Sequence, residues 1–404
     1  MHVAVLGAGV AGVTTAYYLA EFGHTVTVIE RASAVATETS FANGAQLSYS
    51  YTDSLANPEF IPQIPSLLLG LDPAIRIRMM RNFSVFPWGL RFLAQCTRAK
   101  ASENTIAVLK IALRSAALLE QLQQKLSLKF SYAAVGKLVL LASPRDVEAA
   151  KVKSALKRQH GCETEVLNPD EAIIKEPALA FMRQDFAGAV YAEHDHVGDA
   201  HAFTRNLSDW LQTNRSVEFD FDRDISGLDV NTGRFLGVQT ATGTIHADAA
   251  VVCLGPWSQQ LLTPHGINPM LYPVRGYSVT LPPGPHAPTV SITSLRHRIV
   301  YSHFDNKVRI AGFADFVGFN TSRDTERISL MCEIAKQAAP EAADYDAKSI
   351  RPWGGFRPVT PSGQPNVGPS GIDGLFVNTG HGSLGWTVAC ATAESAARAV
   401  TNSE

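Results

Sequence analysis

Three glycines near the start of the chain stand at the spacing that nucleotide-binding proteins use for a phosphate-binding turn. The segment Gly7-Ala8-Gly9-Val10-Ala11-Gly12 lies between two apolar runs. Gly7 permits a tight turn, Gly9 lets the backbone approach a pyrophosphate, and Gly12 lets a helix pack closely on a strand. The N-terminus of that helix offers free N–H groups and a positive dipole end to phosphates. The spacing therefore predicts a dinucleotide site.

The elements that would position this turn are also readable. An apolar strand (Val3–Leu6) precedes it, and an apolar helix follows it and ends near Gly23. A second strand (Thr25–Ile29) then ends on Glu30, where a ribose hydroxyl needs a carboxylate acceptor, and Arg31 is its neighbour. We interpret this stretch as a βαβ nucleotide-binding unit that includes Glu30 and Arg31.

Composition limits the remaining possibilities. The chain has 404 residues, of which 46% are hydrophobic, which is enough for two domains with separate cores. A net charge of −2 argues against nucleic acid as the main partner. The 5 cysteines show no CxxC and no metal-ligand spacing, which suits a reducing compartment. Because the first strand begins at His2 and no apolar run is long enough to span a membrane, we expect a cytoplasmic protein that is soluble or at most peripheral.

Two stretches allow more than one interpretation. The polar segment Glu38–Gln46 is either a surface loop or part of the cofactor cradle. The stretch Ile61–Lys100 mixes aromatic and apolar residues with arginines that include Arg76, Arg78 and Arg81. It either contacts an anionic membrane surface or forms helices that cover a substrate pocket.

The middle of the chain reads as scaffold. A long helix is expected from about Glu103 to Leu126, with Ser102 or Asn104 near its cap. His194-Asp195-His196 suggests a metal site, but a turn followed by a helix that Asp199 caps is the better interpretation.

The second half of the chain is expected to return to the nucleotide sheet and to add a second one. A buried strand near Ala249–Leu254 ends at Gly255, which places Gly255 beside the nucleotide crevice. Short β-type runs dominate Tyr272–Thr325, with Asp305-Asn306 as a hairpin turn. These patterns predict an antiparallel sheet as the floor of a substrate domain.

Several stretches together carry a family resemblance. The chain resembles the small subunit of bacterial D-amino-acid dehydrogenase, within the D-amino-acid oxidase and glycine oxidase group of flavoproteins. The stretches, in chain order, are the N-terminal unit, Glu38–Gln46, Tyr272–Ser278, Phe304–Asn306, Val317–Thr321, Phe356–Pro358 and Asn378–Gly382. Two departures are Gly44-Ala45, where the family more often has Ala-Gly, and a chain that stops soon after the last helix, without the usual tail.

The resemblance implies FAD and an α/β fold in two parts. We expect a Rossmann-like FAD-binding domain made of residues 1–60, 195–265 and 351–404. The substrate domain, α+β with a mixed and largely antiparallel sheet, would comprise residues 61–194 and 266–350. Besides the N-terminal turn, the expected flavin contacts are Ser40, Asn43, Gly44, Ala45, Gln46, Leu47, Gly255, Gly380, His381, Gly382, Ser383 and Leu384.

Three residues are expected to act in catalysis. Arg357 matches the arginine that holds the substrate carboxylate in this group, and a guanidinium binds carboxylates in a bidentate fork. The alternative is an arginine paired with an internal acid. Tyr277 is either a hydroxyl for that carboxylate or a pocket wall, and His381 is either a flavin-side group or only a turn residue. No metal ligands are expected.

The implied reaction is the oxidative deamination of D-amino acids to 2-oxo acids and ammonia. A hydride would pass from the α-carbon to flavin N5, and a quinone or electron-transfer partner would take the electrons. Peripheral contact with the inner face of the cell membrane is a further expectation. The alternative function is oxidation of a secondary amine such as proline, hydroxyproline or an opine.

Overall fold

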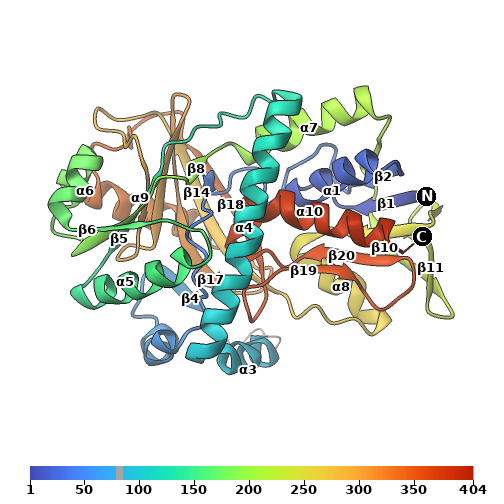
Figure 1. The fold of residues 1–404 in the computed structure, drawn as a ribbon, viewed down its shortest axis with the longest axis horizontal. Helices are drawn as coiled ribbons and strands as arrows, with labels where there is room; N and C mark the ends of the chain where they lie inside the picture. Colours follow the sequence, from blue (N-terminus) through green and yellow to red (C-terminus); the bar gives the residue numbers. More distant parts are fainter. Residues whose placement is uncertain (79–84, 404) are drawn as a thin grey trace.

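Two large β-sheets dominate the fold. A computed structural model describes residues 1–78 and 85–403. The six-stranded sheet lies at right in Figure 1 with both chain ends, and the nine-stranded sheet lies at left. This arrangement confirms the expected α/β fold with a mixed second sheet.

The six-stranded sheet is built around the N-terminal strand. Its order is β19-β20-β13-β1-β2-β9, and all neighbours are parallel except β19 and β20. Residues 3–6 of β1 are apolar and fully buried, as a strand covered on both faces requires. The strands are β1 (His2–Leu6), β2 (Thr25–Ile29), β9 (Glu218–Asp220), β13 (Ala249–Val252), β19 (Asn366–Pro369) and β20 (Leu375–Thr379).

The glycine turn connects β1 to α1 (Val10–Glu21) and confirms the expected βαβ unit. Gly7 has a φ of +100°, a conformation that residues with a side chain rarely adopt. A Cβ added at Gly12 would lie 1.8 Å from the carbonyl oxygen of Gly7. Gly12 therefore permits the close approach of α1 to the turn.

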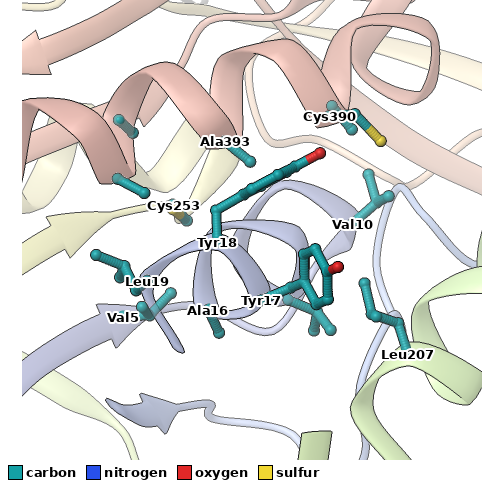
Figure 2. Close-up of a cluster of buried hydrophobic side chains, with 14 of the residues drawn as sticks. Val5, Val10, Ala16, Tyr17, Tyr18, Leu19, Leu207, Cys253, Cys390 and Ala393 are labelled. Carbon is teal, nitrogen blue, oxygen red and sulfur yellow. The ribbon is translucent and has the colours of Figure 1, made fainter. Parts of the chain in front are cut away.

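Helices from distant parts of the sequence cover one face of this sheet. A shared apolar cluster joins α1 to α4 (Arg98–Leu126), α7 (Ala200–Asn214) and α10 (Gly385–Thr401). Figure 2 shows Tyr18 lying between α1 and Ala393 of α10, and Tyr17 on the side of Leu207 of α7. The other face packs on β10 (Ile225–Asn231), β11 (Arg234–Thr240), β12 (Gly243–His246) and α8 (Ser258–Leu262).

The long helix α4 begins earlier than expected. The hydroxyl of Thr97 accepts a hydrogen bond from the backbone N–H of Lys100 and caps the helix. The prediction of Ser102 or Asn104 as the cap was wrong, because the intervening residues 98–101 (Arg-Ala-Lys-Ala) favour helix and do not interrupt it. By contrast, Asp199 caps α7 as expected, since its carboxylate accepts the N–H groups of His201 and Ala202.

The second sheet has nine strands. Its order is β18-β14-β17-β16-β15-β5-β7-β6, with β4 paired to β17. Among the described strands of this sheet, only the β15–β5 and β17–β4 pairs are parallel. Residues 305–306 form the expected turn between β16 and β17. The strands are β4 (Ile75–Ile77), β5 (Lys137–Leu141), β6 (Glu165–Leu167), β7 (Gly188–Ala192), β14 (Tyr272–Leu281), β15 (Ser291–Ser294), β16 (Ile299–Phe304), β17 (Lys307–Phe316) and β18 (Arg351–Val359).

Short elements complete the fold around this sheet. The helix α9 (Asp324–Ala338) packs against it through Met331 and Ala335. The strand β3 (Gln46–Leu47) pairs with β8 (His196–Val197). The other helical elements are α2 (Ile64–Leu68), α3 (Val85–Gln95), α5 (Pro144–Arg158), α6 (Pro169–Lys175) and the 3₁₀ turns at Pro58–Gln63, Pro177–Met182, Gly255–Trp257, Thr263–His265 and Gly382–Leu384.

The chain passes between the two sheets several times. We propose the two-domain division expected from the sequence, with one adjustment. β18 opens the last expected FAD-domain segment, but it pairs with β14 in the nine-stranded sheet. We therefore count β18 with the substrate side.

The close approach at Gly12 predicts a large destabilisation in Gly12→Ala. The clash involves a backbone oxygen, which cannot rotate away, so we expect a loss of about 3 kcal/mol or more in the free energy of unfolding. Gly9→Ala is the control, because its added Cβ would meet only the Ser40 hydroxyl oxygen, at 3.6 Å. Urea denaturation of both variants tests this, and equal stability of the two would contradict it.

Candidate active site

A cavity of about 580 Å³ lies between the two sheets. On one side it is bounded by the glycine turn and by the residues that follow β2 and β13, at the carboxyl ends of these parallel strands. On the other side it is bounded by strands of the nine-stranded sheet. The carboxyl ends of parallel strands are where open α/β sheets bind ligands.

The glycine turn leaves a space and a set of donors for phosphate. No side chain caps α1, and the N–H of Val10 donates to the hydroxyl oxygen of Ser40 at 3.0 Å. Gly9 and Ser40 both line the cavity. The helix N-terminus and a serine hydroxyl thus meet at one end of the cavity.

The carboxylate of Glu30 is fixed by backbone donors. Its Oε2 accepts the N–H of Ala8 at 2.7 Å, and its Oε1 accepts the N–H of Ala32 at 3.0 Å. Arg31 pairs with Glu38, and its guanidinium lies 4.2 Å from the ring centre of Trp257. The acid expected to bind a ribose therefore lies at the end of β2, beside the turn.

Most of the predicted cofactor residues line this one cavity. Among the described residues, five of the predicted contacts lie outside its lining: Ala8, Gly12, Ala45, Leu47 and Gly380. The predicted residues that line it are Gly7, Gly9, Val10, Ala11, Glu30, Arg31, Ser40, Asn43, Gly44, Gln46, Gly255, His381, Gly382, Ser383 and Leu384, together with Tyr277 and Arg357.

The segment 42–48 is a wall of the cavity rather than a surface loop. Five neighbouring strands, β14, β17, β16, β15 and β5, each hold it with one polar side chain. The bonds run from Ser278 Oγ to the Ala42 carbonyl at 2.5 Å, Arg309 Nη1 to the Asn43 carbonyl at 2.8 Å, Ser302 Oγ to the Gly44 carbonyl at 2.7 Å, Gln46 Nε2 to Ser291 Oγ at 2.6 Å, and Lys137 Nζ to Ser48 Oγ at 2.7 Å.

The Gly44-Ala45 order has a steric consequence. Ala45 has a φ of +56°, in the left-handed region that favours glycine. A Cβ added at Gly44 would lie 3.2 Å from Val300 Cγ2. The chain therefore keeps its glycine where space against the sheet is short and accepts backbone strain at the next residue.

Arg357 enters the cavity from β18, above the backbone of Gly276. A Cβ added at Gly276 would lie 2.5 Å from the guanidinium carbon, so any larger residue there would displace the guanidinium from this position. Nη1 of Arg357 donates to the carbonyl of Phe313 at 2.7 Å. Burial lowers the pKa of Arg357, but it forms no ion pair within the described chain. The alternative of an arginine paired with an internal acid is therefore not what the structure has.

Asp315, the acid whose charge acts on Arg357, already has other partners. Asp315 is fully buried and pairs with Arg76 at 2.7 Å and with Arg327 at 2.8 Å. The hydroxyl of Tyr277 donates to it at 2.9 Å, and burial together with Asp315 raises the pKa of Tyr277. Tyr277 thus lines the cavity with its proton committed to Asp315, and Arg357 is left for another anion.

His381 is buried at the turn before α10. Its Nε2 lies 3.0 Å from Asn378 Oδ1 and 3.1 Å from Thr392 Oγ1, and burial lowers its pKa to about 4. The ring is therefore neutral at physiological pH and is held by hydrogen bonds. No side chain caps α10, and its first residues, 385–387, line the cavity. The positive end of α10 consequently faces the ligand space.

A second cavity of about 820 Å³ adjoins the first. It is lined mainly by apolar side chains, among them Leu67 of α2 and Trp88 of α3, and it shares Arg357 and Tyr51 with the first cavity. An apolar space thus leads from the region of α2 and α3 to Arg357.

Sequence reasoning missed two charged residues here. Lys137 is the first residue of the apolar strand β5, and it is buried and lines the first cavity. Asp315 stands within the apolar run of β17, and an acid in a buried strand was a signal that could have identified it. Tyr51, which lies beside Lys137, lines both cavities.

The buried neutral state of His381 predicts a pH dependence of stability. Its pKa is about 4 in the folded chain against an ordinary value of 6.5, so protonation favours unfolding. The stabilisation is full above pH 6.5 and falls by about 3 kcal/mol as the pH drops to 4. The free energy of unfolding is measured for wild type and His381→Gln across this pH range, with saturating cofactor. It should depend less on pH in the variant than in wild type. Parallel curves would contradict the assignment.

Comparison with known proteins agrees with this geometry. The family model of FAD dependent oxidoreductases matches residues 2–399. A protein named D-amino acid dehydrogenase 2 from Ralstonia nicotianae is 40% identical, and the match covers 97% of this chain and 95% of the relative. A D-amino acid dehydrogenase from Paramagnetospirillum magneticum is 37% identical, with 96% and 92% covered.

Solved structures share the fold at low identity. Glycine oxidase from Geobacillus kaustophilus superposes with a TM-score of 0.76 at 20% identity, covering 100% of this chain and 95% of that one. L-proline dehydrogenase from P. horikoshii gives 0.75 at 17% identity, covering 99% and 93%. With the family match over nearly the whole chain, these findings mean that the chain belongs to the FAD dependent oxidoreductase family.

Proposed function

We propose that this flavoenzyme oxidises D-amino acids to 2-oxo acids and ammonia. The observation that carries the proposal is Arg357, a cavity-lining guanidinium without an acidic partner in the described chain. An α-carboxylate supplies the missing charge in a bidentate fork. The fold does not specify the configuration of the substrate, since neighbours of the same fold are named for glycine and for L-proline. We therefore base the D configuration on the names of the relatives at 40% and 37% identity.

The residues present fit FAD. The space beside Gly9 is open, since a Cβ added there would meet only the Ser40 hydroxyl, and Glu30 stands ready-positioned for a ribose. The uncapped start of α10 lies at the same cavity as Arg357. We propose that the glycine turn holds the pyrophosphate and that the turn at residues 380–384 with α10 faces the flavin ring.

The chain's own groups can orient the substrate and stabilise charge. FAD supplies a two-electron acceptor when it is bound. Arg357 would hold the substrate carboxylate, and the positive end of α10 would stabilise negative charge on the ring. Neutral His381 holds the turn by its bonds to Asn378 and Thr392. With the amine entering deprotonated, none of these groups has to act as a base.

The Arg357 assignment predicts a loss of selectivity for the carboxylate. In Arg357→Ala we expect kcat/KM for D-alanine to fall roughly thirty- to several-thousand-fold. This corresponds to a loss of about 2 to 5 kcal/mol of transition-state stabilisation. Arg357→Lys should recover only part, because an ammonium cannot reproduce the fork. The measurement is anaerobic bleaching of bound FAD by D-alanine and by ethylamine.

The control is Arg351→Ala, which removes an exposed arginine from the same strand. It should behave as wild type. If Arg357→Ala retains FAD and still prefers D-alanine over ethylamine to the wild-type extent, Arg357 does not bind the carboxylate. A panel that adds D-proline and an opine separates the secondary-amine alternative, which predicts faster bleaching by those compounds.

The electron acceptor is proposed to be a quinone or an electron-transfer partner. The second cavity is mainly apolar and reaches Arg357, which suits an apolar acceptor better than a charged one. Exposed leucines surround the helices that line it, among them Leu69 at 74% and Leu90 at 69% exposure. We propose that this surface contacts the inner face of the cell membrane.

The expected arginine contacts need revision. Arg76 is one of the three arginines in the stretch for which a membrane contact was one of two expectations, and it pairs with buried Asp315. Arg81 lies outside the described residues, as does Phe83 of the same stretch. Within the described chain, no helix is both long and apolar enough to span a bilayer. The proposed contact therefore rests on exposed leucines rather than on Arg76.

This surface predicts vesicle binding that depends on leucines. Leu69→Ser with Leu90→Ser should lower co-sedimentation with anionic vesicles at least tenfold, since each buried leucine contributes about 1.5 to 3 kcal/mol. Val152→Ser with Ile174→Ser is the matched control, because both residues are exposed apolar positions elsewhere, at 72% and 81%. Equal binding of both double variants, or no binding by wild type at low salt, would refute the contact.

A further inference from the structure

The buried lysine of the cofactor cavity has no assigned role. Lys137 is the first residue of β5 and only 1% exposed, yet it lines the cavity. Its ammonium donates to Gln46 Oε1 at 3.0 Å and to Ser48 Oγ at 2.7 Å, and it lies 4.6 Å from the ring centre of Tyr51. These partners carry no negative charge, and Lys137 forms no ion pair in the part of the chain that the structure describes.

Apart from Arg357, several other cations near this cavity have acidic partners. Arg31 pairs with Glu38, and Arg223 pairs with Asp220. Lys157, a second buried lysine, donates to Asp53 at 2.8 Å. A buried ammonium without a direct ion pair is costly, although the charge of Asp195 acts on Lys137 without forming one. Such an ammonium at a ligand cavity indicates that the ligand supplies further negative charge.

The position of Lys137 identifies the end of the cavity on which its charge acts. Ser48, which accepts its hydrogen bond, donates its own backbone N–H to Thr387 Oγ1 at 3.0 Å. Thr387 stands in the first turn of α10, whose N-terminus has no side-chain cap. Two hydrogen bonds through Ser48 therefore connect the ammonium to the first turn of α10, and Lys137 and Thr387 both line the cavity.

We propose that Lys137 is a charge-stabilising residue that favours the reduced state of the bound FAD. The inference rests on the flavin placement proposed above. Transfer of a hydride, two electrons with one proton, from the substrate α-carbon to the isoalloxazine adds one negative charge to the ring. The imino acid is left on the substrate side, and the amine proton has already gone to solvent. A nearby ammonium stabilises that added charge.

The surroundings of Lys137 set its titration. Burial lowers the pKa of Lys137 to about 8. Asp195, in the turn before β8, opposes this shift, and Lys157 from α5 adds to it. Asp195 itself accepts two hydrogen bonds from Ser50, and the Tyr51 ring covers the ammonium. The charge is thus present at neutral pH and is lost as the pH rises above about 8.

The test is the midpoint potential of bound FAD, measured by dithionite titration against a redox dye. Lys137→Gln keeps hydrogen-bond donors for Gln46 and Ser48 but removes the charge, and Lys137→Met removes both. At pH 6.5 we expect the ratio of oxidised to reduced FAD at equilibrium to be about tenfold higher or more in both variants than in wild type. This lowers the midpoint potential by about 30 mV for a two-electron couple. Lys157→Gln, the matched buried-lysine control, should keep the wild-type potential.

The outcomes separate a charge effect from a structural one. If Lys137→Gln has the wild-type potential, hydrogen bonding alone explains the residue and the proposal is wrong. The difference in midpoint potential between wild type and Lys137→Gln should become smaller at pH 10, where Lys137 has lost its charge. A difference that stays constant between pH 6.5 and pH 10 would also overturn the proposal. If the potential is unchanged and only oxidation of dicarboxylic D-amino acids falls, Lys137 serves a substrate carboxylate instead. Because no substrate enters the titration, a failure of the proposed substrate class leaves this result interpretable.

Discussion

Burying a cation without a direct ion pair is costly, and the lining of one cavity in this fold contains two such cations, Arg357 and Lys137. Removing an ion from water costs several kcal/mol even after relaxation. Asp315, the acid whose charge acts on Arg357, already pairs with Arg76 and Arg327 and accepts the Tyr277 hydroxyl. Lys137 donates hydrogen bonds only to neutral partners in the described chain, and Asp195 acts on it without forming an ion pair. The fold thus retains two positive charges that a flavin and a carboxylate substrate can neutralise.

The two sheets have complementary roles in placing these charges. The parallel sheet supplies the glycine turn, Glu30 and the start of α10, all at one edge. Strands of the second sheet supply Arg357 and Lys137, and a row of polar side chains holds segment 42–48 against it. Since both cations come from β-strands, sheet register rather than loop conformation fixes their positions.

Local patterns made the N-terminal unit predictable. The glycine spacing, the strand periodicity and the hairpin at residues 305–306 each depend on neighbours in sequence, and the structure has all three. Lys137 could not be recognised in this way, because its significance comes from Ser48 and Tyr51, more than eighty residues away in the chain. The pairing of Arg76 with Asp315 likewise depends on tertiary contact, so composition alone could not identify it.

The central claim is that Arg357 receives the substrate carboxylate, and a crystal structure of the FAD-bound enzyme with 2-aminoisobutyrate tests it most directly. This amino acid lacks an α-hydrogen and cannot be oxidised. We expect both carboxylate oxygens at about 2.7–2.9 Å from Arg357 nitrogens, with the amine on the flavin side. A carboxylate bound elsewhere, with Arg357 still bonded only to the carbonyls of Phe313 and Gly312, would contradict it.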